Sequence, residues 1–254
     1  PQLVELLVDI VSTSPALAQY LSRNASVFDA VIGGDFFSEW VGQAFLQSAL
    51  MDLLIRESDY EAKLDAARRW TKELHFRVGV HLLRGLIDAK EAGVQYNDLA
   101  RAVVGAIWPA VVDEFTRRYG PPPGRGAVVL GMGSLGAGML NAGSDLDLIV
   151  IYDPAGVDVS TGPRGLETRA YYARLTQAMI TALTVPMAQG RLYEVDMRLR
   201  PSGNQGPVAT SWTSFQDYQQ NNAWVWEHLA LTRADYLAGS TDLGSDIENF
   251  RQGT

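Results

Sequence analysis

Residues 131–153, GMGSLGAGMLNAGSDLDLIVIYD, support two incompatible predictions. Gly131, Gly133 and Gly136 have the G-x-G-x-x-G spacing, and Asp153 ends the following apolar run. That pattern is typical of a dinucleotide-binding turn. Such a turn opens a full helix that leads to a parallel strand within a unit of about 30 residues, whereas only about ten residues separate Gly133 from the next apolar run. The spacing favours one short helix and a quick return, and the dinucleotide hypothesis is the weaker one.

The second prediction rests on Asp145 and Asp147, which follow the Gly-Ser pair at 133–134. Side chains alternate between the two faces of a strand, so these two carboxylates point the same way. Leu146, Leu148 and Val150 then point the opposite way, toward a core. The Gly-Ser turn followed by D-x-D therefore indicates metal-dependent nucleotide chemistry, which gives both carboxylates a use.

A later segment, RLYEVDMRLR at 191–200, has the same alternation and predicts another strand. Asp196, Arg198 and Arg200 would share one face of it. If the two charged faces adjoin, three carboxylates meet beside two guanidiniums. Divalent cations would relieve the repulsion, and Mg²⁺ binds carboxylate oxygens together with substrate phosphate. The competing interpretation is a pair of solvated amphipathic strands whose spacing arose by chance.

Composition excludes several classes of protein. The 254 residues have a net charge of −8 and no cysteine. The acidic balance and the absence of a basic cluster argue against nucleic acid as a partner. No apolar run is long enough for a membrane span, and the first residues do not resemble a signal peptide. We therefore expect a cytoplasmic protein without disulfides. Because the sequence opens on Pro instead of Met and ends just after a helical pattern, we also expect it to be a piece of a longer protein.

The pattern of apolar residues divides the chain. Residues 1–119 have helical periodicity, and the segment YGPPPGRG at 119–126 ends it. Strands are then expected at 127–132, 145–153 and 191–200, with a long helix at about 167–187. The expected fold class is α+β, with a helical lead-in at 1–125, a catalytic core at 126–211 and the start of a helical region at 212–254.

This constellation resembles the DNA polymerase β-type nucleotidyltransferase superfamily, whose mark is Gly-Ser, then D-x-D, then a third carboxylate. Four segments further resemble the glutamine synthetase adenylyltransferase family, and the motif VDMRLRPSG is the most specific part of the match. These segments are 7–32, 131–153, LYEVDMRLRPSGNQGPVATS at 192–211 and FQDYQQNNAWVWEHLALTRA at 215–234. The resemblance implies a polymerase β-like core with a small mixed sheet.

The resemblance also implies the chemistry, which is transfer of AMP from ATP to a tyrosine of glutamine synthetase. Asp145, Asp147 and Asp196 would hold two Mg²⁺ ions. Phosphate would be bound by Gly133 and Ser134 and by Arg198 or Arg200; these four are the expected nucleotide-binding residues. The family commonly has lysine where this chain has Ser134, so a role for lysine cannot be carried over. PII signalling proteins and glutamine are the implied regulators of the full-length enzyme.

Family members of this kind contain one half that attaches AMP and one that removes it by phosphorolysis. The segment NAWVWEH at 222–228 looks more like the attaching, C-terminal half. The removing half, a transferase acting on a small molecule or an RNA end, and a non-catalytic module remain alternatives. Phe215, Tyr218, Trp224 and Trp226 are interpreted as a helical core after an N-cap at Ser211, with a base-stacking platform as the alternative.

Overall fold

A computed structural model describes every residue except 1, 25–26, 28–30, 32–34 and 254. Parts of the segment 7–32 therefore lie outside the described residues. The helices of the N-terminal region are α1 (Gln2–Thr13), α2 (Pro15–Arg23), the 3-10 turn η1 (Asp35–Phe37), α4 (Gln43–Arg56), α5 (Tyr60–Leu83) and α6 (Ala89–Tyr119). The later helices are α7 (Gly133–Gly136), α8 (Thr168–Thr184), η2 (Gly203–Gln205), α9 (Trp212–Asn221), α10 (Val225–Leu231) and α11 (Thr241–Gly253).

The strands form one small mixed sheet in the order β3-β2-β1-β5, and β4 also pairs with β2. They are β1 (Gly126–Gly131), β2 (Leu146–Asp153), β3 (Val195–Asp196), β4 (Thr210–Ser211) and β5 (Asp235–Gly239). β1 pairs antiparallel with β2 and with β5, whereas β2 pairs parallel with β3 and β4. The antiparallel return from β1 to β2 excludes a dinucleotide-binding unit, whose first two strands are parallel.

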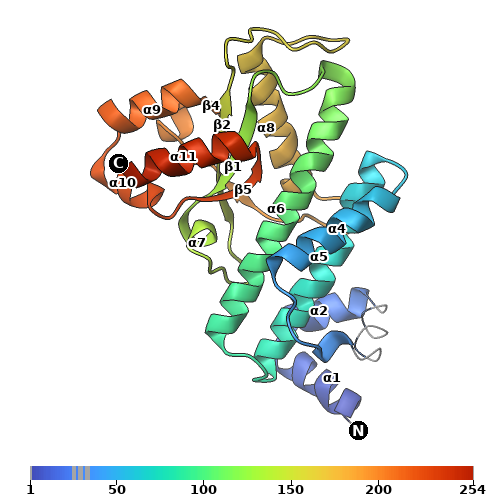
Figure 1. Cartoon of the computed structure of the whole chain (residues 1–254). Coiled ribbons are helices and arrows are strands. Elements are labelled where there is room, and N and C mark those ends of the chain that lie inside the picture. Colours follow the sequence, from blue (N-terminus) through green and yellow to red (C-terminus); the bar gives the residue numbers. More distant parts are fainter. Residues whose placement is uncertain (1, 25–26, 28–30, 32–34, 254) are drawn as a thin grey trace.

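Both faces of the central strands are buried. Val129, Leu148 and Val150 contribute to one core together with residues of α6 and α8. The alternate residues Ile149 and Ile151 belong to a second core, formed with α9, α10 and α11. In Figure 1 the long helix α6 accordingly lies between the N-terminal helices and the sheet, while α9, α10 and α11 lie on the other side. The predicted alternation of β2 is confirmed, and its second face is buried as well.

The N-terminal helices add a third core. α1 and α2 pack on α5 through apolar side chains that include Leu6, Ile10, Leu21, Phe76 and Val80. α6 begins with a capping box at Asp88 and Glu91 and ends at Tyr119, where Gly120 takes φ +86°. The predicted end of the helical region at 119 is confirmed. Across the described residues, no helix has both the length and the apolar character required to cross a membrane.

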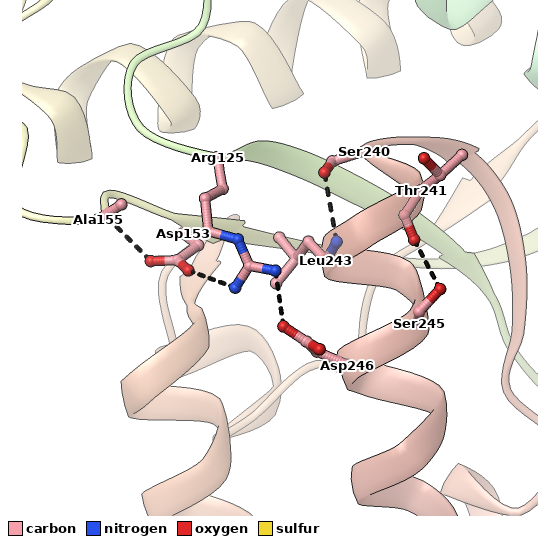
Figure 2. A network of polar contacts seen from close by, with 8 residues as sticks. All are labelled: Arg125, Asp153, Ala155, Ser240, Thr241, Leu243, Ser245 and Asp246. Carbon is pink, nitrogen blue, oxygen red and sulfur yellow. Dashed lines mark hydrogen bonds and ion pairs between the residues drawn. The ribbon is translucent and has the colours of Figure 1, made fainter.

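Arg125, which directly precedes β1, forms ion pairs with the end of β2 and with α11 (Figure 2). Its guanidinium lies 3.1 Å from a carboxylate oxygen of Asp153 and 2.6 Å from one of Asp246 in α11. The other oxygen of Asp153 accepts a hydrogen bond of 2.9 Å from the backbone N–H of Ala155. Asp153, the acid that the dinucleotide hypothesis would have used, therefore caps a turn and holds Arg125.

The turn after β1 requires glycine for space. A Cβ added at Gly136 would lie 1.8 Å from the carbonyl oxygen of Arg233 and 2.6 Å from that of Gly131. Backbone atoms cannot move aside as a flexible side chain can, so α7 packs closely on the segment after α10 only because residue 136 has no side chain.

Replacing Gly136 with alanine should therefore destabilise the fold by about 1–3 kcal/mol or more, as overpacking against fixed atoms does. Thermal or urea unfolding measures this directly. Gly143→Ala is the matched control, because a Cβ at Gly143 would meet nothing within 4 Å. Equal stability of Gly136→Ala and the wild type would show that α7 is not packed in this way.

Candidate active site

The expected carboxylates come together where β2 begins. Parallel pairing places Leu146 opposite Val195 and Asp147 opposite Asp196, and the N–H of Leu146 donates a hydrogen bond of 2.9 Å to the carbonyl of Glu194. Because Leu146 and Val195 face the core shared with α6 and α8, their neighbours Asp147 and Asp196 project from the other face. Asp145 is exposed just before the strand begins.

The glycine turn lies directly against this pair. The backbone N–H of Met132 donates to the carbonyl of Asp147 at 2.8 Å, which ties the end of β1 to β2. Gly133 follows with φ +53°, and a Cβ there would lie 2.3 Å from Oδ2 of Asp147. A side chain at residue 133 would thus displace the Asp147 carboxylate as well as block the backbone. Ser134 is exposed on the first turn of α7, where the N–H groups have no partner within the helix.

The electrostatics of the pair are uneven. Burial is the main reason that the pKa of Asp147 is raised, and the charges of Asp196 and Asp145 raise it further. Hydrogen bonding from the Arg198 side chain instead lowers the pKa of Asp196. Asp147 is therefore the carboxylate of the pair whose ionised form is disfavoured, and positive charge near it would favour that form.

Arg198 and Arg200 have different positions from those predicted. β3 ends at Asp196, so the strand expected at 191–200 is wrong except for Val195 and Asp196. Oδ1 of Asp196 accepts a hydrogen bond of 2.8 Å from the backbone N–H of Arg198. Such a local turn competes with an extended strand. Met197 and Leu199 consequently join different cores instead of sharing one face.

The two guanidiniums have separate roles in this geometry. Arg198 reaches back to Asp196, with Nε 2.7 Å and Nη2 2.5 Å from Oδ2. The Arg200 guanidinium donates to the carbonyl oxygens of Met197 at 2.7 Å and Gly206 at 3.3 Å, so it supports the loop. The Arg198 side chain is 72% exposed and is thus the more accessible of the two to an anionic ligand.

A cleft of about 500 Å³ adjoins the carboxylates. Its lining includes Asp145, Asp196, Arg198, Arg200 and Asn204. Asn204, in η2, was not predicted, and nothing in the spacing of a single asparagine in a loop would have indicated it. A cleft lined by both acidic and basic side chains can hold an anion together with a cation.

The donor set suits a hard cation, because carboxylate oxygens are the preferred ligands of Mg²⁺. Among the described residues, however, no group of three or more His, Cys, Asp or Glu side chains is arranged to hold a metal ion. The carboxylates are neighbours, but Asp196 points its oxygens at Arg198. Arg198 would therefore compete with a cation for the oxygens of Asp196.

The aromatic residues after the sheet divide into two groups. Phe215 is fully buried in the core under α9, α10 and α11, and Ser211 caps α9, as predicted. The prediction is wrong for Trp224 and Trp226, which are 71% and 56% exposed and do not belong to that core. Glu227 accepts hydrogen bonds from the Tyr218 hydroxyl and the Trp224 N–H, both at 2.8 Å, and so fixes the start of α10.

Comparison with known proteins identifies relatives over nearly the whole chain. Residues 4–250 match the family described as glutamate-ammonia ligase adenylyltransferase. The chain is 46% identical over 240 residues to a bifunctional glutamine synthetase adenylyltransferase/adenylyl-removing enzyme of Brucella suis. The aligned residues make up 94% of this chain and 24% of that protein. Proteins of the same description from Mesorhizobium japonicum and Agrobacterium fabrum are each 42% identical over 98% of the chain and 25% of their own length. The chain thus spans about a quarter of the length of these relatives.

Removing the charge of Asp147 should stabilise the protein in buffer containing EDTA. Because its pKa is raised in the folded state, ionisation of Asp147 costs the folded state free energy in full above that raised pKa; the cost shrinks as pH falls from the raised pKa toward the ordinary one and is absent below it. Asp147→Asn should therefore raise Tm at neutral pH by about 1–3 °C. It should also abolish any rise in Tm that Mg²⁺ gives the wild type.

Asp153→Asn is the matched control, because Asp153 pairs with Arg125 instead of facing other acids. It should lower Tm in the same buffer and leave any Mg²⁺ effect intact. A fall in Tm for Asp147→Asn would contradict the claim that burial and the neighbouring acids disfavour the ionised form of this carboxylate.

Proposed function

This chain belongs to the glutamate-ammonia ligase adenylyltransferase family, and from that premise we propose that it transfers AMP from ATP to a tyrosine of glutamine synthetase and releases pyrophosphate. The observation that carries the proposal is the in-register pair of Asp147 and Asp196 beside the Gly133 turn. An antiparallel hairpin with a Gly-Ser turn, a D-x-D and a third acid on the neighbouring strand supports a polymerase β-like nucleotidyltransferase core.

In the proposed reaction the tyrosyl oxygen attacks the α-phosphorus of ATP, and the bond to the oxygen that bridges the α and β phosphates breaks. Mg²⁺ ions held by Asp145, Asp147 and Asp196 would supply the positive charge that stabilises the attacking and leaving oxygens. The backbone N–H groups at Gly133 and Ser134 would orient the terminal phosphates. Arg198 would neutralise charge on the triphosphate.

We further propose that the chain is divided into three parts. Residues 1–125 would support the core at 126–211, and 212–254 would begin a further helical region. Support for the attaching half, as opposed to the removing half, comes from the segment 222–228. PII signalling proteins and glutamine remain predicted regulators of the full-length enzyme, and the cytoplasm remains its predicted location.

The direct test is incubation of the chain with α-labelled ATP, Mg²⁺ and unmodified glutamine synthetase. We expect label on a tyrosine of glutamine synthetase and release of pyrophosphate. Asp145→Asn should reduce the rate by at least about 100-fold, as loss of electrostatic stabilisation of a transition state typically does. Asp113→Asn, which changes an exposed acid of α6 paired with Arg117, should leave the rate unchanged.

A second reaction distinguishes the alternatives. Adenylylated glutamine synthetase is supplied with inorganic phosphate and no ATP. Rapid ADP release, together with no labelling in the forward reaction, would assign the chain to the removing half. Label on a small molecule instead of the protein would replace the proposed acceptor, and no turnover in either reaction would leave only a non-catalytic role.

A further inference from the structure

Both carboxylate oxygens of Asp196 accept hydrogen bonds from Arg198. Oδ1 accepts from the backbone N–H of Arg198 at 2.8 Å, and Oδ2 accepts from its Nε at 2.7 Å and lies 2.5 Å from its Nη2. Charge-assisted contacts of this length are the strong class of hydrogen bond in proteins. Arg198 therefore fixes the orientation of Asp196 and supplies the positive charge closest to it.

The two partners differ in how tightly the protein holds them. The side chain of Asp196 is 15% exposed, whereas that of Arg198 is 72% exposed. Arg200, two residues later, is held by two backbone carbonyls of its own loop. The Arg198 guanidinium can thus leave its carboxylate by rotating its side chain, without unpacking a core or breaking the loop that Arg200 supports.

A divalent cation and this guanidinium need the same oxygens. Within the described residues no three acidic or imidazole side chains are arranged to hold a metal ion, and both oxygens of Asp196 contact Arg198. The charges of Asp145 and Asp147 also attract Arg198, so its withdrawal removes a positive charge that interacts with all three acids. A cation arriving with an anionic ligand would replace the lost charge and offer Arg198 a new partner.

We propose that Arg198 is a built-in counter-ion of Asp196 that competes with the divalent cation and moves to the phosphates when a metal–nucleoside triphosphate complex binds. This inference rests on the proposed function and deepens it. The site should therefore bind a divalent cation weakly in the absence of nucleotide and more tightly when the cation arrives with nucleotide. Arg198 is thus a positioning residue in the absence of nucleotide and a phosphate ligand in its presence.

The test is Mn²⁺ binding, followed by the electron paramagnetic resonance signal of free Mn²⁺, for the wild type and Arg198→Gln. Without nucleotide, Arg198→Gln should bind Mn²⁺ about tenfold more tightly, the effect of removing one strong competing interaction. With Mn²⁺ saturating, the same variant should bind a non-hydrolysable ATP analogue about tenfold more weakly. If Arg198 had only a structural role, its loss would weaken the binding of Mn²⁺ and of the ATP analogue alike. Tighter Mn²⁺ binding together with weaker binding of the analogue would therefore identify the proposed movement of Arg198.

Arg117→Gln is the matched control, since it removes an equal charge from an exposed ion pair on α6 and should change neither affinity. Arg198→Lys keeps the charge with fewer donors and should fall between the wild type and Arg198→Gln; it also serves if Arg198→Gln folds poorly. Equal or weaker Mn²⁺ binding by both Arg198 variants would overturn the inference and leave the metal site standing. Absence of Mn²⁺ binding in every protein, with or without nucleotide, would instead overturn the proposed function.

Discussion

Parallel pairing of β2 with β3 forces two like charges, those of Asp147 and Asp196, into adjacent positions. Bringing carboxylates together in a partly buried place is unfavourable unless other groups compensate. The apolar side chains that alternate with them, above all Leu146, hold the strands together from the opposite face. Arg198 supplies the compensating charge on the exposed side. Apolar packing around Leu146 on one face of the two strands therefore keeps Asp147 and Asp196 adjacent on the other face, despite the repulsion between their charges.

The position of β3 depends in turn on a buried arginine far from it in sequence. Arg68 of α5 is fully buried and has hydrogen bonds of 2.8–2.9 Å from its guanidinium to four backbone carbonyls: Leu64, Ala182, Val185 and Gly190. Burial lowers its pKa, and the four carbonyls offset the loss of water. Arg68 thereby joins the N-terminal helices to the end of α8 and to the turn that leads into β3. The helical region is thus part of what places Asp196.

Much of the central hairpin could be predicted because its signals are local. Alternation over Leu146, Leu148 and Val150 and the glycine turn at Gly133 each depend on a few neighbouring residues. The extent of β3 could not be predicted, because a side chain of the strand itself, Asp196, turns the chain at Arg198. Arg68 gave no signal either, since its acceptors are backbone carbonyls. The exposure of Trp224 and Trp226 was missed because aromatic content alone does not say which rings face a core.

The central claim is that Asp145, Asp147 and Asp196 form one metal–nucleotide site with the turn at Gly133. The most direct measurement is a crystal structure with Mn²⁺ and a non-hydrolysable ATP analogue, with the metal located by its anomalous scattering. The account predicts manganese bound by the three aspartates, phosphates against the backbone of Gly133, and Arg198 moved from Asp196 to the phosphates. Manganese bound elsewhere, or nucleotide bound while Arg198 still pairs with Asp196, would contradict it.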